Sequence, residues 1–536
     1  MELIIVGFGP VAGYKYSRCI HNAISRGHLS RYHVIDRESQ QHVVESRLAK
    51  LPIQPATCTY IPEHVLENGP DSGIEWLIEQ GIFSNSAEVK KKVAITTEPQ
   101  SHAAYMKHAL AQRFDVLVTK PLILPMKDGV LDQPGLMPIV NAIASATVEA
   151  RVNTAVLCLG RLHEIWEYKL RRPLSLMMRR LQHPITSIHI RTGSGVWNLP
   201  SEFGSREDHP YKYGYGMLMH GAYHYIDYLA RLLLMNKKLF PEEEFVIVLQ
   251  GFTAGPLDQG LRTAGIEAAT TGYRPELSEL VEGLPYGETD IVASWAMKFK
   301  STGRVLCLGT LALEQTTPGM RSWGPFPDVP YNINGRLHCT DIDVRLGTVF
   351  SISANVTKAP IQGRLGDTDI RSLNAGSVTT RSNARLTKTQ GFIRRENYER
   401  AYGSSYSYTA EADIFERWLL DRQTHSDFPS HVPACALLDG LLRLAAADWH
   451  GNIEVDFNYP APDWPKFSEE DDPWYAHMTD NVTFSYELFP RKPKDKGRCS
   501  VKRNWVGGSG GSGGAAARHP SHPRWKNSGR PHRPLF

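Results

Sequence analysis

The sequence predicts an α/β fold in two parts: an N-terminal parallel sheet covered by helices, then an α/β part with a mostly antiparallel open sheet. Two observations support this prediction. Over the first 160 residues, short apolar strands alternate with helical stretches, which is typical of a parallel sheet covered on both faces. Beyond about residue 236, strand-like runs follow one another with few helices between them, which favours antiparallel pairing.

The first part, placed at 1–160, can be followed element by element. The run ELIIVG at 2–7 is a strand that ends in glycine, and a helical stretch follows it. Further strands are expected at 32–36, 92–97, 114–122 and 154–160, with helices at 16–27, 101–113 and 137–150. Strand and helix units of this length build a parallel sheet whose strands all end at one edge.

The second part, placed at 161–505, begins with a strong helix expected from about Gly216 to Asn236. Strands are expected at 244–252, 290–300, 304–315, 340–356 and 383–392, and closing helices at 410–423 and 434–449. In the fourth strand, Ile342 and Val344 alternate with charged residues, which is the period of a half-buried strand. The Gly/Ser-rich and then Pro/His/Arg-rich stretch 506–536 cannot bury a core, so a flexible tail is predicted there.

The composition limits the classes of partner. The 536 residues are 41% hydrophobic and 22% charged, which is ordinary for a globular protein with two or more cores. The net charge of +4 is mild and no basic stripe is present, so no nucleic-acid partner is expected. No apolar run reaches the roughly 18 residues of a membrane span, and no signal peptide is predicted. Seven scattered cysteines without a CxxC pair predict reduced thiols in a cytoplasmic protein.

A glycine-rich turn directly follows the first strand. Gly7, Gly9 and Ala12 fit the pattern G-x-G-x-x-A, in which the backbone turns tightly and approaches a pyrophosphate at a helix N-terminus. Asp36 ends the second strand, where a carboxylate accepts hydrogen bonds from ribose hydroxyls. The pattern predicts a Rossmann-type site for NAD or NADP. Asp36 favours NAD, whereas the neighbouring Arg37 suits a 2′-phosphate, and a purely structural glycine turn is the alternative.

A second motif, VAITTEPQSHAAYMKHALAQRFDVLVTKPL, delivers Lys120 to the end of a strand. Ligands bind at the carboxyl edge of such sheets. A lysine there can donate a hydrogen bond to a substrate oxygen and to the nicotinamide ribose. Most lysines are simply solvated, so this residue gains meaning only in combination with the other motifs.

The third motif is YGMLMHGAYHYIDYLARLL, at 215–233. As a helix it places His220, His224 and Asp227 within about a 60° arc, with Arg231 alongside and apolar residues opposite. A solvated polar face, a metal site of two histidines and one carboxylate, and a proton-transfer site are all compatible with this pattern. No HExxH pattern is present, and no metal is predicted. Histidine titrates near neutrality, so His224 is the natural general base.

Together the motifs resemble the Gfo/Idh/MocA family of NAD(P)-dependent oxidoreductases, which act largely on sugars, inositols and related polyols. The matching runs, in the family's order, are GFGPVA, Asp36, TTEPQSH, TKP and HGAYHYID. The resemblance implies a Rossmann domain, a C-terminal α/β domain whose sheet often mediates homo-oligomers, NAD or NADP as the cofactor, and a small sugar-like or polyol-like substrate.

The resemblance also implies roles for single residues. Lys120 would polarise the substrate oxygen, His224 would shuttle the proton and His220 would support it. The cofactor would contact Gly7, Phe8, Gly9, Pro10, Val11, Ala12, Asp36, Arg37, Thr96, Thr97, His102 and Lys120. Three residues depart from the family pattern: Thr119 stands where a glutamate is usual before the lysine, His220 where an aspartate is usual, and Ala222 where a glycine is usual.

The candidate substrate contacts are Asp227 in this helix, Tyr211 and Lys212 in the stretch before it, and Arg161 after the last strand of the first part. An ordinary polar loop is the alternative for Tyr211 and Lys212. The predicted function is an NAD(P)-dependent oxidoreductase that interconverts a secondary hydroxyl and a ketone on a sugar, cyclitol or related polyol. A non-catalytic dinucleotide-binding regulator of the same family and an NAD-dependent, redox-assisted glycoside hydrolase stay open as alternatives. The altered Thr119 and His220 and the long insertions after about residue 236 favour the regulator, whereas the retained Lys120 and His224 speak against it.

Overall fold

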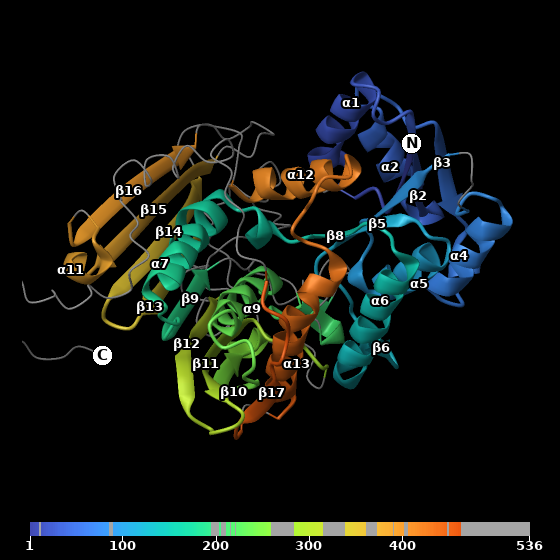
Figure 1. Cartoon of the computed structure of the whole chain (residues 1–536). Helices are drawn as coiled ribbons and strands as arrows, with labels where there is room; N and C mark the ends of the chain where they lie inside the picture. The colour runs from blue at the N-terminus through green and yellow to red at the C-terminus, as the bar shows by residue number, and fades with distance from the viewer. Residues whose placement is uncertain are drawn as a thin grey trace, which may run out of the picture. The chain divides into compact units, whose positions relative to one another are not determined.

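The computed structural model describes residues 1–9, 12–84, 89–193, 203–204, 211–214, 216–219, 221–258, 284–314, 338–360, 372–389, 391–400, 406–447 and 450–462. All of these residues lie in one compact unit (Figure 1). Pro10, Val11, His220 and the expected tail at 506–536 lie outside the described residues. None of the helices in the described ranges combines the length and the apolar content that a membrane crossing needs.

The first sheet has six strands in the order β3-β2-β1-β4-β5-β8, and every printed pairing is parallel. The strands are β1 (Glu2–Val6), β2 (Arg31–Arg37), β3 (Thr57–Ile61), β4 (Lys91–Ile95), β5 (Asp115–Thr119) and β8 (Thr154–Leu157). The chain runs outward from β1 to β3 and then returns to β4 on the other side of β1. This reversal creates a crevice at the carboxyl ends of β1 and β4, where such folds bind ligands.

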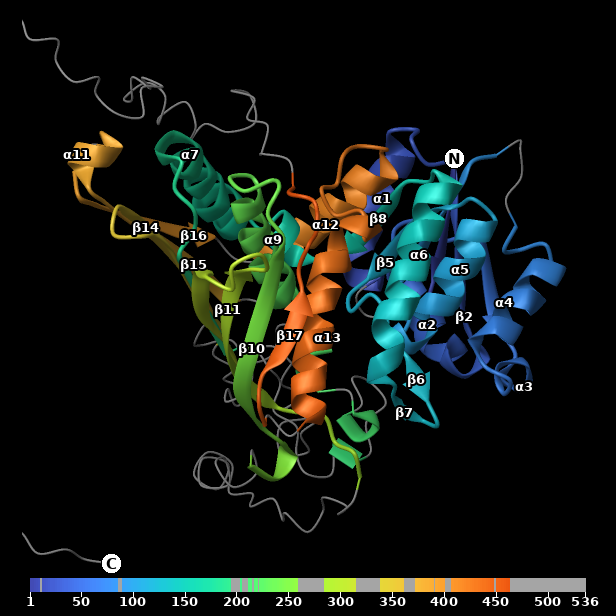
Figure 2. The same ribbon diagram turned by 60° about the horizontal axis from the view of Figure 1, so that its bottom comes forward.

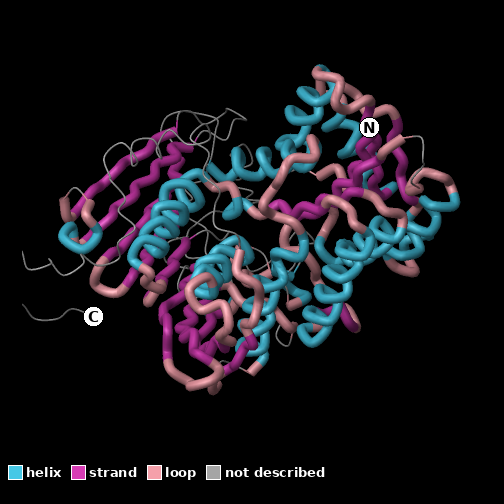
Figure 3. The backbone as a smooth tube through the Cα atoms, in the orientation of Figure 1, coloured by secondary structure: helices cyan, strands magenta, loops and turns pink. Residues whose placement is uncertain are grey.

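Helices accompany these strands, as the alternating pattern predicts. They are α1 (Ser17–Ser25) with the π-helical turn η1 (Ala12–Tyr16) before it, α2 (Gln41–Leu48), α3 (Glu63–Leu66), α4 (Pro70–Glu79), α5 (His102–Ala111) and α6 (Leu136–Ala150) (Figure 3). All five residues of β1 are buried, which explains its unbroken apolar run. The predicted Rossmann-type architecture is confirmed, and β3 is a strand that the sequence pattern missed.

The second sheet has nine strands in the order β16-β15-β14-β13-β9-β12-β11-β10-β17, and only the pairing of β9 with β12 is parallel among those described. The strands are β9 (Ser187–Gly193), β10 (Phe245–Ala254), β11 (Asp290–Phe299), β12 (Val305–Glu314), β13 (His338–Leu346), β14 (Phe350–Pro360), β15 (Ser372–Ser382), β16 (Ile393–Arg400) and β17 (Ile453–Asp456). The mostly antiparallel sheet is therefore confirmed. A small separate ribbon pairs β6 (Met126–Lys127) with β7 (Val130–Leu131).

Two strand predictions were wrong in detail. The run expected as one strand at 340–356 is the hairpin of β13 and β14, because Gly347 adopts a φ of +54° and the chain reverses there. The run expected as a strand at 383–392 instead contains the short helix α11 (Ala384–Thr387). The Asn383 side chain caps this helix by accepting a hydrogen bond from the Leu386 amide, and β16 begins only afterwards.

Helices cover one face of the second sheet. They include α7 (Arg172–Leu181), α9 (Tyr223–Lys237) and α13 (Val432–Ala446). The helix α13 packs against α9, β10 and β17, and also against α6 of the first part, and Figure 2 shows it beside β17. Gly440 allows this approach, because a Cβ there would lie 2.3 Å from Val455 of β17.

The helix α9 differs from its prediction in two respects. It begins at Tyr223 rather than near Gly216, because the amides of Met217 and Leu218 donate to the backbone oxygen and the carboxylate of Glu288. It is also buried from Tyr223 to Asn236, which excludes a solvated polar face, one of the three interpretations that the sequence left open. Its polar residues must therefore find partners inside the protein.

The helix α12 (Tyr406–Leu419) belongs to the expected second part but packs on the first. It contacts β8, α1 and η1, and the rings of Tyr16 and Phe415 stack with their centroids 4.4 Å apart. At its end, the buried Lys92 Nζ of β4 donates to the Trp418 carbonyl at 2.6 Å and to Asp421 at 2.6 Å. Residues far along the chain therefore complete the core beneath the glycine-rich turn.

Candidate functional site

The glycine-rich turn lies at the crevice between β1 and β4. Gly7 has a φ of +83°, and a Cβ at this position would lie 2.9 Å from Thr97 Cγ2, so only glycine fits. A Cβ on Gly9 would meet nothing within 4 Å. The backbone at Gly9 therefore borders open space at the switch point of the sheet, as close approach of a pyrophosphate requires.

Asp36 stands beside this turn at the end of β2. One carboxylate oxygen accepts from the Phe8 amide at 2.6 Å and the other from the Arg37 amide at 2.8 Å. Each oxygen keeps a second lone pair that a ribose hydroxyl can use. Arg47 fixes the turn from the other side, since its Nη1 donates to the Phe8 carbonyl at 3.0 Å.

The side chain of Arg37 is engaged with a second carboxylate. Its Nη2 donates to Glu63 Oε2 at 3.0 Å. Hydrogen bonds from Ser39 and Arg37 lower the pKa of Glu63 to about 2, so this carboxylate is charged at neutral pH. Glu63 thereby occupies a donor of the guanidinium that a 2′-phosphate would need, which agrees with the prediction that NAD is favoured over NADP.

His102 connects the ends of β4 and β5. Its Nδ1 lies 3.1 Å from the Pro121 oxygen and 3.0 Å from the Leu122 oxygen, and its Nε2 lies 3.0 Å from the Thr97 oxygen. The Thr119 hydroxyl lies 3.3 Å from the same Nε2. The ring is fully buried, so it holds the Thr97 loop and the Lys-Pro segment together, and a direct contact with the cofactor stays a prediction.

Lys120 and Cys158 are neighbours at the carboxyl edge of the sheet. The register of β5 and β8 pairs Thr119 with Leu157, the last residues of the two strands, and Lys120 and Cys158 directly follow them in the chain. Adjacent strands lie about 4.8 Å apart, so the two residues leave the sheet side by side. Lys120 is half-buried, whereas Cys158 is completely buried.

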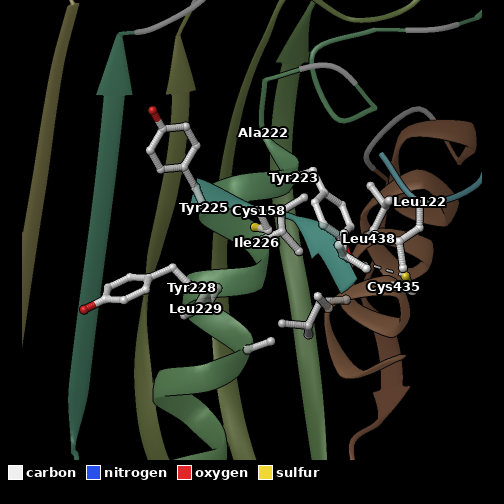
Figure 4. Packing of buried hydrophobic residues seen from close by; sticks show 14 of the residues in the cluster. Leu122, Cys158, Ala222, Tyr223, Tyr225, Ile226, Tyr228, Leu229, Cys435 and Leu438 are labelled. Atoms are coloured by element: carbon white, nitrogen blue, oxygen red, sulfur yellow. Dashed lines mark hydrogen bonds between the residues drawn. The ribbon is translucent and has the colours of Figure 1, made fainter. Parts of the chain in front are cut away.

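Cys158 reaches the first turn of α9, as Figure 4 shows. Its Sγ lies 3.5 Å from His224 Nδ1 and 3.5 Å from Asp227 Oδ2. Arg161 forms a two-pronged ion pair with Asp227, at 2.8 Å from Nε and 2.6 Å from Nη2. Burial opposes ionisation of Asp227, but the Arg161 guanidinium outweighs it and holds the pKa of this carboxyl at about 2.

In the next turn of α9, Arg231 also belongs to a buried ion pair. Arg231 donates to Glu167 at 2.9 Å and to the Gly160 carbonyl at 3.2 Å, and Arg171 donates to the same carboxylate at 2.7 Å. Burial raises the pKa of Glu167, but the charges of Arg171 and Arg231 bring it down to about 2. A solvated polar face is therefore the wrong interpretation of Asp227 and Arg231, because both side chains are buried within ion pairs.

Cys158, Asp227 and His431 bring three possible metal-ligand atoms within 4.8 Å of one another. Both oxygens of Asp227, however, already face the positive guanidinium of Arg161. A second cation at this place would be repelled across a few ångströms of buried protein. The cluster is therefore better described as an internal polar network than as a metal centre.

Ser426, His431 and Asp227 resemble a serine-hydrolase triad, but their hydrogen bonds have the wrong directions. Ser426 donates its proton to the Val156 carbonyl at 2.6 Å, so its oxygen accepts from His431 Nε2 at 3.0 Å. The other ring nitrogen then accepts from the Tyr223 hydroxyl at 3.1 Å. All three triad-like side chains are fully buried, so Ser426 cannot reach a substrate, and the group connects β8 and α9 to the segment before α13.

The other predicted substrate contacts have different surroundings. Tyr211 is buried and packs edge-on against Phe203 with ring centroids 5.1 Å apart, which is a core role. The Lys212 ammonium lies 5.0 Å from the Tyr213 ring centroid. Substrate contacts by these residues stay predictions, and the supporting role of His220 lies outside the described residues. Cys158 is absent from the site residues predicted from the sequence, although its position just after a strand, level with Lys120, is a signal that indicates it.

Comparison with known proteins gives a fold-level likeness. No family model and no curated protein matches the chain. The WlbA dehydrogenase from Bordetella pertussis, solved with NADH and UDP-GlcNAcA, is 13% identical, with 86% of this chain and 99% of that chain covered and a TM-score of 0.46. GenD2 from gentamicin A biosynthesis, solved with NAD, is also 13% identical, with 86% and 97% covered and a TM-score of 0.46. An oxidoreductase from Thermotoga maritima is 14% identical, with 85% and 98% covered and a TM-score of 0.44. At this distance the likeness assigns neither family nor activity, and the function rests on the chain's own residues.

Proposed function

We propose that the protein is an NAD-dependent oxidoreductase that interconverts a secondary hydroxyl and a ketone on a sugar, cyclitol or related polyol. The proposal is supported by the register of β5 and β8, from which Lys120 and Cys158 follow at the same edge of the sheet, and by the Cys158 thiol, which lies 3.5 Å from His224 Nδ1. A lysine and a histidine thereby belong to the same edge of the sheet as the glycine-rich turn. This edge is where a dinucleotide and its substrate meet in folds of this topology.

The residues of the crevice fit a dinucleotide. Gly7 and Gly9 have no side chain that would keep a pyrophosphate away from the backbone, and Asp36 offers lone pairs to the adenosine ribose. Bound NAD supplies the hydride acceptor, or NADH the hydride donor, for the carbon that reacts. The protein's own part is to bind, to orient the substrate and to move the hydroxyl proton.

The lysine and the histidine have different roles at the reacting hydroxyl. The Lys120 ammonium donates to the reacting oxygen and stabilises the negative charge that develops on it. His224 accepts the hydroxyl proton during oxidation and returns it during reduction. Histidine suits this task because its ordinary pKa lies near neutral pH.

The test combines cofactor binding with turnover. NADH and NADPH are titrated by fluorescence, and a panel of sugars, cyclitols and keto sugars is screened at 340 nm. We expect tighter binding of NADH than of NADPH, and turnover that falls by at least about 100-fold in Lys120→Ala and His224→Ala. The matched controls are Lys107→Ala and His28→Ala, because both side chains are exposed on helices or turns of the same domain.

The possible results separate the candidate functions. Tight NADH binding without turnover across a broad panel would favour a non-catalytic regulator. Turnover of a glycoside without net NADH release would favour redox-assisted hydrolysis. Failure to bind either nucleotide would refute the proposal at its first step.

A further inference from the structure

We propose that Cys158 is a positioning residue that sets the tautomer of His224 and so directs the base nitrogen to Nε2. This inference rests on the proposed function, since it explains how His224 is prepared for proton transfer. It starts from three contacts: the thiol of Cys158 lies 3.5 Å from His224 Nδ1 and 3.5 Å from Asp227 Oδ2, and Asp227 is paired with Arg161.

The first step is the state of Asp227. Two nitrogens of Arg161 bind its two oxygens, and both side chains are buried. Arg161 is itself fixed, because its remaining donors bind the Ser430 hydroxyl and carbonyl, each at 3.0 Å, and the His425 carbonyl at 3.2 Å. Asp227 is therefore a charged carboxylate in a fixed position, and it can only accept hydrogen bonds.

His431 is the other ring that faces Asp227, at 3.4 Å from its Oδ1. Its Nε2 donates to Ser426, so in the neutral ring Nδ1 carries a lone pair and accepts from Tyr223. Burial lowers the pKa of His431 well below its ordinary value, which keeps the ring neutral. His431 therefore gives no proton to Asp227, and Cys158 donates to a lone pair of Oδ2 that the hydrogen bond from Arg161 Nε leaves available.

The second step is the state of the thiol. Burial, and then the charge of Asp227, raise the pKa of Cys158 well above its ordinary value, so the group is a neutral thiol with one proton. Of its two neighbours, the carboxylate is the stronger acceptor. The S–H bond therefore points to Asp227 Oδ2, and the sulfur lone pairs face His224 Nδ1.

The third step is the tautomer of His224. A sulfur lone pair can only accept, so Nδ1 must carry the ring proton for this contact to be favourable. In a neutral imidazole the lone pair then belongs to Nε2, and this nitrogen becomes the base. The contacts form one ordered series in which His224 donates to Cys158, Cys158 donates to Asp227, and Arg161 holds Asp227 in place.

This arrangement bears on the departure noted in the sequence. In the family that the chain resembles, an aspartate stands four residues before the base, and this chain has His220 there. The thiol provides an acceptor for the ring N–H of His224 from a different element, the end of β8. The base is thereby oriented without a charged residue at position 220.

The test uses Cys158→Ser, Cys158→Ala and the control Cys307→Ala, which removes a buried thiol from β12. The protein is labelled with 15N in its histidine rings, and His224 is identified by comparison with His224→Gln. Without cofactor or substrate, we expect His224 to carry its proton on Nδ1 in the wild type, in Cys158→Ser and in Cys307→Ala. In Cys158→Ala we expect the proton to shift wholly or partly to Nε2.

A wild-type proton on Nε2, or no change in Cys158→Ala, would overturn the proposal. Thermal unfolding of the two alanine variants gives the general effect of removing a buried thiol, and only Cys158→Ala should also change the tautomer.

Measurements of kcat and KM require turnover, so they distinguish the positioning role of Cys158 from the proposed oxidoreductase function. We expect kcat to fall by about 10-fold or more in Cys158→Ala, with KM and NADH affinity unchanged, and to recover largely in Cys158→Ser. Equal kcat in wild type and Cys158→Ala would refute the positioning role. A wild type with the expected tautomer but no turnover would instead refute the proposed function and leave the hydrogen-bond order standing.

Discussion

Gly7 and Gly9 occupy the same turn, but their surroundings give them different tasks. Gly7 combines a φ of +83° with a Cβ position 2.9 Å from Thr97, whereas the Cβ position of Gly9 is open. We expect Gly7→Ala to lower the free energy of unfolding by about 1–3 kcal/mol, because strain and a steric clash add. We expect Gly9→Ala to leave stability unchanged and to weaken NADH binding at least about 10-fold, because the methyl group fills the pyrophosphate position.

Urea unfolding and NADH fluorescence titration of the two variants check this division. Gly27→Ala is the matched control for Gly7→Ala, since Gly27 also has a positive φ, of +72°, but no neighbour near its Cβ position. A Gly9→Ala variant that binds NADH normally would contradict the placement of the cofactor.

His431 predicts a pH dependence of stability. Burial lowers its pKa, the neighbouring Arg161 and Arg231 lower it further and Asp227 raises it, so the folded protein keeps the ring neutral. The unfolded chain takes up a proton below about pH 6.5, so this contribution is fully present above pH 6.5 and declines as the pH falls. The slope from one such group reaches about 1.4 kcal/mol per pH unit.

Urea midpoints measured from pH 7.5 to pH 5 check this expectation. The loss of stability in this range should be smaller in His431→Asn than in the wild type, while the exposed control His28→Asn should keep the wild-type slope. The buried Asp227 and Glu167 do not contribute to the change in stability between pH 7.5 and pH 5. Their pKa values of about 2 place their own loss of stabilisation below about pH 4.5. Equal slopes in all three proteins would contradict the neutral buried ring.

Local sequence patterns predicted the residues of the dinucleotide turn but not the internal network. Gly7, Gly9 and Asp36 carry their signal within one strand-turn-helix-strand unit. Asp227 lies 66 residues from Arg161, and the contact exists only after α9 has packed between the sheets. A hydropathy pattern counts Asp227 and Arg231 as surface residues, because it cannot see partners that neutralise a buried charge.

Among the elements, α12 shows how the first sheet is closed from a distant part of the chain. Lys92 of β4 is completely buried, and its Nζ donates to the Trp418 carbonyl and to Asp421. We expect Lys92→Met to lower the free energy of unfolding by about 1–3 kcal/mol, because the carbonyl and carboxylate lose a buried partner. The neighbouring Lys90→Met should cost less than about 1 kcal/mol, since Lys90 is 54% exposed.

Chemical unfolding of both variants measures the difference. Equal losses in the two variants would show that the buried ammonium does not hold α12 to the sheet.

The sequence predicted α12 as a helix but not its partner, because periodicity reveals that a helix has an apolar face and not which sheet covers it.

At the scale of the whole molecule, the outer face of the large sheet carries an apolar area on β10, β11 and β12. Phe252 is 78% exposed, Val292 46% and Leu308 52%. Phe252 pairs directly with Val292, so these two exposed side chains adjoin one another, whereas Leu308 pairs with Ala296 farther along β11. Such an area supports the predicted homo-oligomer through the C-terminal sheet.

We expect Leu308→Glu combined with Val292→Glu to convert an oligomer into monomers, because charges on this face would have to be buried without partners. Light scattering after size-exclusion chromatography gives the mass of each form. Val130→Glu together with Val148→Glu is the matched control on the first part of the chain, where both side chains are exposed. A monomeric wild type, or a double variant with unchanged mass, would contradict the prediction.

The distant origin of α12 has a consequence during synthesis. The ribosome adds the last strand of the first sheet, which ends at Leu157, about 260 residues before Trp418. At 5–20 residues per second, α12 is synthesised roughly 13–50 s after β8. During this time the apolar surface around Tyr16 and Leu157 stays uncovered. The nascent N-terminal part is therefore a natural client for chaperones, and slow codons before position 406 would lengthen the period in which it can aggregate.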